Sequence, residues 1–236
     1  MLTCLQDAVS EDDVWSRFAH VAREEFGFTS ILYGFTHNKY TASRVGITRS
    51  LYMRHNHPDG YVNAYENGSF LDSDPCATRL FETGASVVWQ DVFEDKTPES
   101  RKRQDIGRGF NLDVGVTVGA VFASGQGITG AGLSAGGQRP AEFRRMWTAR
   151  RREIEALFYA FDARARPGMI ERRLRLSPRE RDVIAYAAGG LTGKEIAMRL
   201  GIRPKSVFNV MERARTSLEA ATTFEAIAKA YAYNLI

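Results

Sequence analysis

The stretch LSPRERDVIAYAAGGLTGKEIAMRLGI, residues 176–202, contains the same helix-start pattern twice. In this capping box, a Ser or Thr side chain accepts a hydrogen bond from the first helical turn. A Glu three residues later bonds back to the backbone of the capping residue. Ser177 and Glu180 form the first copy, and Thr192 and Glu195 form the second. The stretch therefore predicts two short helices.

Glycine and proline mark the ends of these helices. Gly189 and Gly190 follow the first helix, and Gly201 follows the second, as is common at helix C-termini. Pro178 and Pro204 fall at the start of a helix, where the missing N–H costs no hydrogen bond. Two short helices joined by a tight glycine turn, with a third beginning near Pro204, are typical of a helix-turn-helix.

The third predicted helix separates into an apolar stripe and a polar face. The stripe, which we expect to be buried, consists of Val207, Met211, Ala214 and Leu218. The residues left for a DNA groove and its phosphates are Lys205, Ser206, Phe208, Asn209, Glu212 and Arg213. Basic side chains give affinity for phosphates, whereas short polar side chains read base edges. The predicted DNA-binding residues are Lys194, Arg203, Lys205, Ser206, Phe208, Asn209 and Arg213.

The basic charge of the chain is concentrated in the same region. Residues 171–236 contain twelve Lys or Arg and seven Asp or Glu, whereas residues 1–170 contain twenty and twenty-one. A basic excess over helices is typical of a surface that binds a polyanion such as nucleic acid. A basic helical surface that only faces solvent explains the charge equally well.

Length and composition limit the class of protein. A chain of 236 residues suffices for two small domains, or for one domain with an appendage, and its 44% hydrophobic and 25% charged residues are those of a globular protein. Only Cys4 and Cys76 are present, so a disulfide framework is excluded. With no leading apolar segment and no apolar run of about 20 residues, we expect a cytoplasmic protein without a membrane span.

The first 165 residues alternate between helical and strand patterns. Ser10 and Asp13 begin an amphipathic helix that ends at Gly27. Predicted strands then occupy 28–35, 86–89 and two segments joined by Gly125-Gln126-Gly127; predicted helices occupy 97–110 and 141–163, and 58–72 is ambiguous. This order predicts an α/β/α sandwich domain over 1–165, a linker at 166–175 around Pro167-Gly168, and an all-α domain over 176–236.

Two apparent motifs do not withstand a test of their context. Gly125, Gly127 and Gly130 have the spacing of a dinucleotide-binding loop, but no helical periodicity follows to present an N-terminus to a pyrophosphate. A hairpin turn is the better interpretation. His55 and His57 have no cysteines at a spacing typical of zinc sites, so we expect no metal. No catalytic constellation is visible, and we expect no enzyme activity.

Residues 176–236 as a whole resemble the four-helix DNA-binding module of the LuxR-type transcription regulators. The resemblance includes Glu180, Gly190, the Glu195-Ile196-Ala197 run and Ser206-Val207, which begins the helix that this family lays in the major groove. A third capping pair, Thr222 and Glu225, begins the last helix. In the family, that helix contributes to the DNA-bound dimer.

The N-terminal part resembles the ligand-binding domain of the acyl-homoserine-lactone receptors of the same family. Those receptors carry a Trp, a Tyr four residues later, an Asp-Pro pair, and a second Trp fifteen residues after the Asp. The corresponding residues in this sequence are Tyr61, Tyr65, Asp74-Pro75 and Trp89. Gly115 stands where the family has a glycine before a Thr in a strand. Ser134 stands where a Ser or Thr often contacts the ligand amide.

The resemblance implies a role for each residue. Asp74 would accept the amide N–H of the signal, Trp89 would pack against the lactone ring, and Ser134 would bond the amide carbonyl. A loop Asp satisfied by backbone amides remains an alternative for Asp74. The full set of predicted ligand-binding residues is His57, Tyr61, Tyr65, Asp74, Trp89 and Ser134.

The sequence departs from the family at five positions. The lactone-binding Trp is Tyr61, a Tyr four residues earlier is His57, and a Pro after the Thr strand is Gly119. Phe208 and Val210 stand where relatives carry polar or charged residues. Because Tyr and His still form hydrogen bonds, the ligand site is altered rather than erased.

These observations predict a cytoplasmic transcription regulator that needs no cofactor. Its signal is expected to be an N-acyl- or aroyl-homoserine lactone or a related molecule, and its target a near-palindromic site in double-stranded DNA, bound as a homodimer. Three alternatives remain. The regulator acts without a ligand or answers a non-lactone signal; it sequesters a related regulator in heterodimers as an anti-activator; or it is an enzyme that uses the glycine-rich turn.

Overall fold

The chain forms two compact units, Met1–Arg166 and Pro167–Ile236, in a computed structural model. The structure describes residues 3–37, 52–67, 74–122 and 127–236. The division between the units falls inside a helix, α9, which spans Pro140–Arg173. Each unit is described by itself below.

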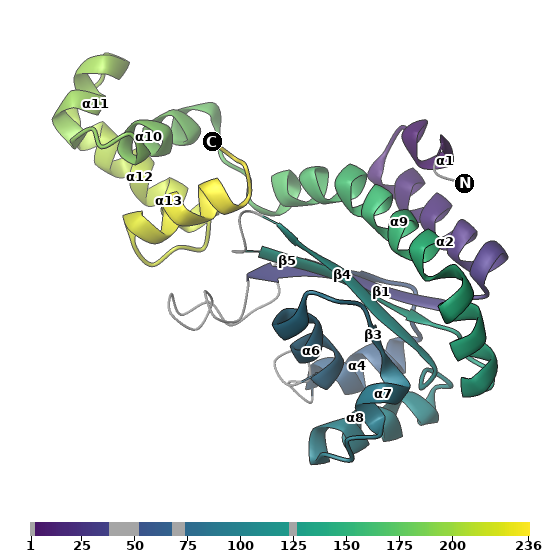
Figure 1. Ribbon diagram of the computed structural model, residues 1–236. Helices are drawn as coiled ribbons and strands as arrows, with labels where there is room; N and C mark the ends of the chain where they lie inside the picture. The colour runs from purple at the N-terminus through teal and green to yellow at the C-terminus, as the bar shows by residue number, and fades with distance from the viewer. Residues whose placement is uncertain (1–2, 38–51, 68–73, 123–126) are drawn as a thin grey trace. The chain divides into compact units, whose positions relative to one another are not determined.

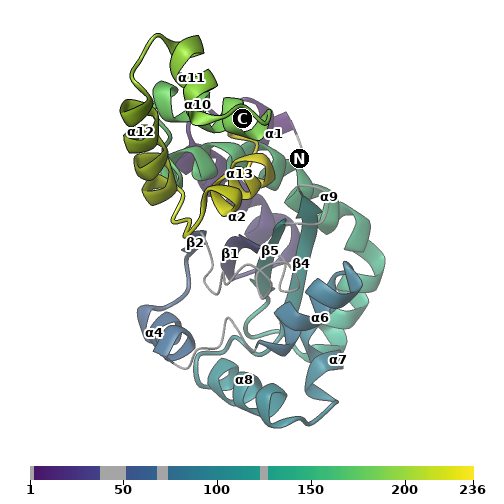
Figure 2. The same cartoon turned by 90° about the vertical axis from the view of Figure 1, so that its left-hand side faces the viewer.

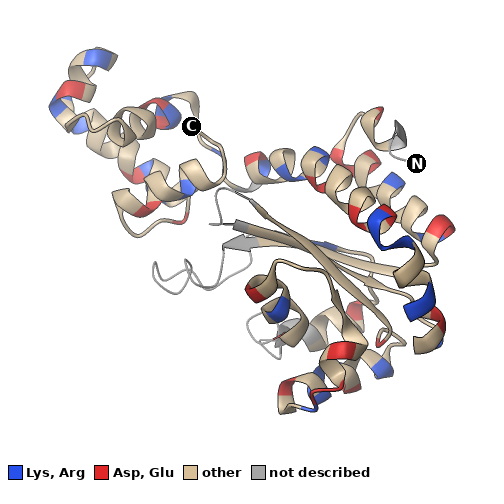
Figure 3. Cartoon of the chain, in the orientation of Figure 1, with Lys and Arg blue, Asp and Glu red and all other residues tan. Residues whose placement is uncertain are grey.

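An antiparallel sheet of five strands, in the order β2-β1-β5-β4-β3, forms the centre of the first unit. The strands are β1 (Ser30–His37), β2 (Tyr52–His55), β3 (Val87–Val88), β4 (Gly115–Phe122) and β5 (Gly127–Ser134). Figure 3 shows that the sheet carries almost no charged residues, as expected for strands covered on both faces. The predicted β4–β5 hairpin is confirmed, although most of its turn lies outside the described residues.

Helices cover both faces of this sheet. One face is covered by α2 (Glu11–Phe26) and α9, with the short α1 (Thr3–Gln6) before them (Figure 1). The other face carries α4 (Asp59–Asn67), α6 (Pro75–Thr83), α7 (Trp89–Phe93) and α8 (Pro98–Gly109), which Figure 2 shows from the side. The predicted α/β/α sandwich is therefore confirmed.

Aromatic side chains hold α2 and α9 against the sheet. The rings of Phe18 and Phe161 stack with centroids 4.1 Å apart, and Tyr33 meets Phe161 edge-on at 5.0 Å. The Tyr33 hydroxyl donates to Oδ1 of Asp162 at 2.8 Å. Arg166 pairs with the other oxygen of Asp162 at 3.0 Å, so this buried carboxylate is balanced within the layer. Burial, together with the charge of Asp162, raises the pKa of Tyr33 well above its usual value.

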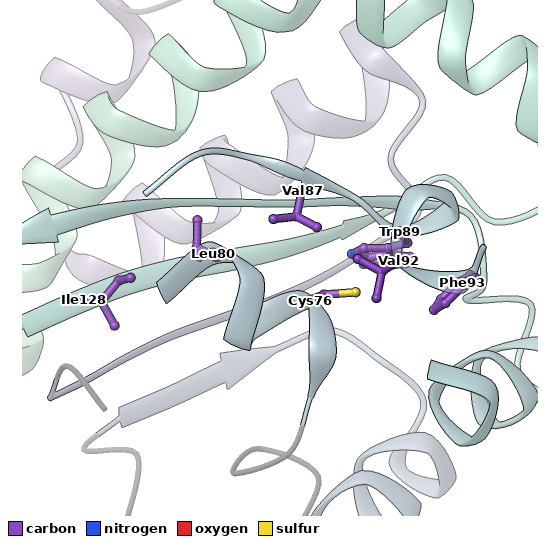
Figure 4. Packing of buried hydrophobic residues seen from close by; sticks show 7 residues of the cluster. All are labelled: Cys76, Leu80, Val87, Trp89, Val92, Phe93 and Ile128. Carbon is purple, nitrogen blue, oxygen red and sulfur yellow. The ribbon is translucent and has the colours of Figure 1, made fainter. Parts of the chain in front are cut away.

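The opposite face of the sheet is lined with small residues that admit bulky side chains from α6 and α7. A Cβ atom at Gly115 would lie 2.7 Å from the ring of Trp89, and one at Gly119 would lie 2.5 Å from Leu80. Figure 4 shows Trp89 and Leu80 among the buried residues of this layer, beside Cys76. Gly119, which replaces the Pro of the family, is explained by the close packing of Leu80.

Several boundaries differ from the sequence predictions. The predicted end of the long helix at 163 is wrong, because α9 continues through Pro167 to Arg173. Proline is unfavourable inside a helix, but Met169 and Ile170 beyond it are buried, and their burial offsets that cost. The ambiguous segment 58–72 contributes α4, and the strand predicted at 86–89 is shorter because Trp89 begins α7.

The second unit contains the four predicted helices: α10 (Pro178–Ala188), α11 (Gly193–Leu200), α12 (Pro204–Ser217) and α13 (Thr223–Ala232). Both capping boxes are confirmed, with reciprocal side-chain and backbone hydrogen bonds at Ser177 and Thr192. Gly190 and Gly201 adopt positive φ angles of 86° and 63°, which few other residues tolerate. The predicted stripe of Val207, Met211, Ala214 and Leu218 is buried, as is Val210.

Candidate functional site

The helix α4 and the segment before it bring two aromatic residues of the predicted ligand site together. His57 and Tyr61 are both buried, and their rings meet edge-on with centroids 4.8 Å apart. Nδ1 of His57 is hydrogen-bonded to the Ser30 hydroxyl of β1. Tyr61 also meets Phe110 at 5.7 Å. This corner of the site is therefore anchored to the sheet through Ser30.

Both rings are electrically neutral near pH 7. Burial lowers the pKa of His57 to about 3, with further lowering by electrostatic interaction with Arg103 and then His55. Burial raises the pKa of Tyr61 to about 12. The imidazole and the phenol can thus exchange hydrogen bonds with a ligand without adding a charge to the site.

Asp74 performs a local structural role as the N-cap of α6. Its Oδ1 accepts from the backbone N–H of Cys76 at 2.7 Å and of Ala77 at 3.2 Å, and Pro75 occupies the first helical position. The residue is 5% exposed. A carboxylate has about four acceptor positions, so capping leaves Oδ2 able to face other groups. The alternative, in which backbone amides satisfy the Asp74 carboxylate, thus describes Oδ1, one of its two oxygens.

Trp89, the first residue of α7, lies against the sheet. Its Nε1 donates to Oγ1 of Thr117 on β4 at 2.8 Å, and its ring packs on Gly115. Because the indole N–H is engaged by the protein, Trp89 offers the site its ring surface rather than a donor. Thr117, which fixes the ring, was not identified from the sequence.

Arg103 of α8 joins these residues, and it too was missed by the sequence analysis. It is 4% exposed, and its Nε lies 3.5 Å from Oδ2 of Asp74. Its guanidinium carbon lies 4.6 Å from the centre of the Trp89 ring and 5.8 Å from that of Tyr61. The spacing of the buried residues Ser100, Arg103 and Gly107 is helical, but their polarity concealed the pattern.

Ser134 lies at the end of β5 on the face of the sheet that carries this cluster. It is directly opposite Ser30 on β1 and Gly115 on β4, and cross-strand partners share a face. Its hydroxyl donates to the carbonyl of Val114 at 3.3 Å. Tyr65 belongs to α4, but its side chain is outside the described part of the chain.

Together these residues form a buried cluster with aromatic walls and a few polar groups, which is typical of a small-molecule site. We call Tyr61, Asp74, Trp89 and Arg103 the head-group cluster. It arises from α4, α6, α7 and α8, all on one face of the sheet. Within the described ranges, no group of three or more His, Cys, Asp or Glu side chains is arranged to hold a metal ion.

The second unit exposes most of the predicted DNA-binding side chains. Lys194, Arg203, Lys205, Phe208, Asn209 and Arg213 are exposed, and Ser206 is half-buried. Phe208 is 64% exposed, so it belongs to the surface of α12, whereas its neighbour Val210 belongs to the core. Figure 3 shows the charged residues distributed over α10 to α13. Arg213 pairs with Glu180 of α10, with 3.4 Å between Nε and Oε1.

A buried aromatic and polar cluster in an α/β/α unit, followed by a helix-turn-helix unit, defines the class of transcription regulators controlled by small molecules. Residues 10–165 match the autoinducer binding domain, and residues 174–230 match the domain of bacterial regulatory proteins of the luxR family. The chain belongs to this LuxR family of quorum-sensing transcription regulators, which are not enzymes. The resemblance inferred from the sequence is confirmed.

Two relatives have similar sequences. The chain is 30% identical over 186 residues to the HTH-type quorum sensing-dependent transcriptional regulator RpaR of Rhodopseudomonas palustris, covering 76% of this chain and 72% of RpaR. It is 26% identical over 187 residues to the transcriptional activator protein SolR of Ralstonia nicotianae, covering 76% of each chain.

Solved structures share the fold at lower identity. SdiA of Escherichia coli aligns with a TM-score of 0.64 at 20% identity, covering 100% of this chain and 96% of that chain. The N-acylhomoserine lactone dependent LuxR family factor CepR2 of Burkholderia cenocepacia aligns with a TM-score of 0.56 at 19% identity, covering 70% and 91%. Every helix in the described part of this chain is too short or too polar to cross a membrane.

Proposed function

We propose that the chain is a cytoplasmic, homodimeric regulator whose binding to double-stranded DNA is controlled by an N-acyl- or aroyl-homoserine lactone or a related small molecule. The observation that carries this proposal is the convergence of Tyr61, Asp74 and Trp89 on one buried cluster in the autoinducer-binding domain. The dependence of CepR2 on an N-acylhomoserine lactone supports the same class of signal.

The role proposed for each residue of the ligand site follows from the hydrogen bonds that its side chain already forms within the protein. Asp74 accepts the amide N–H of the signal through Oδ2, because Oδ1 caps α6. Trp89 packs against the head group through its ring, since Thr117 engages its N–H. Ser134 donates to the amide carbonyl by exchanging its long bond to Val114. His57, Tyr61 and Tyr65 complete the proposed site.

The proposed DNA target is a near-palindrome read by two copies of α12. One recognition helix contacts few base pairs, whereas two helices about one helical turn apart read a site long enough to be specific. Lys194, Arg203, Lys205 and Arg213 are the proposed phosphate contacts. Ser206, Phe208 and Asn209 are the proposed base contacts.

The surface of α13 supports a dimer. Phe224 is 85% exposed and Tyr231 is 59% exposed, and residues seven apart lie on the same face of a helix. Ala228 lies between them and is also exposed. An exposed apolar stripe of this kind is typical of an interaction surface. Replacing Phe224 and Tyr231 by Ser should yield a monomer in sedimentation analysis, whereas replacing exposed Met198 of α11 should leave the dimer intact.

A second candidate function is regulation without a signal, or an anti-activator that acts through heterodimers. The position of Arg103 favours this candidate, because its guanidinium already contacts Asp74 and Trp89, the residues proposed to hold the head group. A protein whose head-group cluster is balanced internally has less need of a ligand to fold.

Selection from randomised duplex DNA tests the two candidates together. Full-length protein is equilibrated with the DNA pool with and without N-octanoyl-homoserine lactone, and bound sequences are compared. The proposed function predicts enrichment of a near-palindrome that is stronger with the lactone. Equal enrichment in both pools favours the ligand-independent regulator. Enrichment only after a related regulator is added favours the heterodimer.

A further inference from the structure

A positively charged side chain lies at the centre of the proposed head-group site. The guanidinium of Arg103 is buried among Tyr61, Asp74 and Trp89, and Gly107 stands one helical turn further along α8. A Cβ atom at residue 107 would lie 3.0 Å from Nη1 of Arg103 and 2.9 Å from the carbonyl of Leu112. The absence of a side chain at Gly107 therefore leaves the space that the Arg103 guanidinium occupies.

The guanidinium lies beside the departure at Tyr61. A tyrosine ring is smaller than an indole, and Arg103 lies over this ring at 5.8 Å. The site thus has a cationic donor beside the position where the family carries a tryptophan. A guanidinium differs from an indole N–H because it is always charged and presents several N–H groups in one plane.

Charge balance limits what this arrangement can accept. Asp74 supplies one negative charge, and its Oδ1 is already bonded to two backbone N–H groups of α6. His57 and Tyr61 are neutral. A purely apolar head group beside this cation offers it no hydrogen bond, which is unfavourable in a buried site. A head group with acceptor oxygens returns charge-assisted bonds to the same cation.

We infer that Arg103 is the specificity-determining residue of the site, and that it selects a signal whose head group presents carbonyl or carboxylate oxygens over Trp89. The inference rests on the proposed function, since it assigns the chemistry of that same ligand. A lactone and its ring-opened homoserine carboxylate carry such oxygens, whereas a cyclopentyl ring of similar size carries none.

Three probes with the same acyl chain separate these possibilities. N-octanoyl-homoserine lactone, N-octanoyl-homoserine and N-cyclopentyl octanamide are each titrated into full-length protein by calorimetry. Wild type should bind the better of the first two at least about tenfold more tightly than the cyclopentyl amide, as for a hydrogen bond to a charged group. The lactone and the open acid, compared directly, show which oxygens are selected.

Substitution of Arg103 then assigns the preference to one side chain. Arg103→Met keeps an apolar chain of similar length and should abolish the preference for acceptor oxygens. Arg103→Lys keeps the positive charge that balances Asp74, and hence the fold, but loses the planar N–H donors. Its preference for acceptor oxygens should therefore lie between those of the wild type and Arg103→Met. Arg101→Met, which alters an exposed residue of the same helix, should behave as wild type.

The outcomes distinguish this inference from the proposed function. An unchanged preference in both Arg103→Met and Arg103→Lys would overturn the inference and leave the receptor function standing. If Arg103→Met bound a probe and the wild type bound none, Arg103 would block the site rather than determine its specificity. That result would also overturn the inference. If neither the wild type nor any variant bound any of the probes, the proposed response to homoserine lactones would be contradicted, and the inference with it.

Discussion

Glu180 and Arg213 connect α10 and α12 through one carboxylate. Oε1 of Glu180 lies 3.4 Å from Nε of Arg213, while Oε2 accepts from the backbone N–H of Ser177 at 2.9 Å. The carboxylate thus caps the first helix of the DNA-binding unit and orients a basic side chain of the third. The Glu180 side chain is 10% exposed and that of Arg213 is 62% exposed, so much of the Arg213 side chain is open to solvent.

Arg213→Ala should weaken DNA binding about equally for all sequences, because a phosphate contact carries no sequence information. The slope of log K against log salt concentration is negative, and its magnitude should decrease by about one unit, as expected for one lost phosphate contact. Binding is measured for full-length protein by fluorescence anisotropy at several salt concentrations. Thermal stability should change by less than about 1 kcal/mol, since the ion pair is largely exposed on one side.

Arg181→Ala is the matched control for Arg213→Ala. Arg181 is an exposed arginine of α10 that we do not assign to the DNA surface. An equal change of slope in both variants would mean that overall charge, and not a contact at Arg213, governs the affinity.

The buried imidazole of His57 should make stability depend on pH. Its pKa in the folded protein is about 3, against an ordinary value near 6.5, so the folded state favours the neutral ring. The stabilisation is fully present above about pH 6.5 and declines as the pH falls from there toward 3. At pH 5 the loss should be about 2 kcal/mol relative to pH 7.

Denaturant unfolding between pH 5 and 7 measures this effect. His57→Asn removes the titrating ring and should flatten the pH dependence, with His20→Asn as the control on an exposed helical surface. An unchanged pH slope in His57→Asn would show that the ring is protonated equally in both states.

Asp74→Asn should lower both stability and signal binding. Asparagine still caps a helix, but it leaves the buried charge of Arg103 without its carboxylate. Loss of one partner of a buried ion pair costs on the order of 3 kcal/mol. The double variant Asp74→Asn with Arg103→Met should recover part of the stability in thermal unfolding, because it removes both charges. No recovery would argue that the two residues are not coupled.

Lys229→Met should destabilise the second unit. Nζ of Lys229 donates to the carbonyls of Leu218 and Glu219, at 3.1 and 2.6 Å, and pairs with Glu225 at 2.9 Å. The residue is 3% exposed, so methionine fills the space but removes the bonds of Nζ to these three acceptors. A loss of roughly 3 kcal/mol is expected.

Thermal unfolding and dimer dissociation measure the role of Lys229. Because this side chain ties the end of α12 to α13, the dimerisation that we propose through α13 should weaken in parallel. Lys194→Met, at an exposed position of α11, is the control and should be neutral for stability. Equal stability of the two variants would contradict the structural role of Lys229.

The helix-turn-helix was predictable because its signals are local. Caps, glycines and the stripe through Val207 and Leu218 each depend on neighbours in the same or an adjacent helix. Lys229 was not predictable, since its three acceptors lie along α13 and at the end of α12 and become visible only once the helices pack.

The proposed ligand site shows the same limit more strongly. Trp89 and Asp74 were identified by their resemblance to the pattern of the family, but their partners Thr117 and Arg103 come from other elements. Arg103 lies in a polar segment, so the composition of that segment does not predict its burial. Two aromatic neighbours and a carboxylate contribute to stabilising the buried side chain. The continuation of α9 through Pro167 was missed because local preference favoured a break there.

The contact of Gly115 with Trp89 has a consequence for how the receptor can acquire new specificity. A methyl group at residue 115 would collide with the indole and, at 2.3 Å, with the carbonyl of Leu133. Residue 115 is therefore closed to any side chain larger than glycine unless β5 and Trp89 move. New specificity, natural or engineered, is more readily reached on α4, where Tyr61 already departs from the Trp of the family, and on α8, which contributes Arg103.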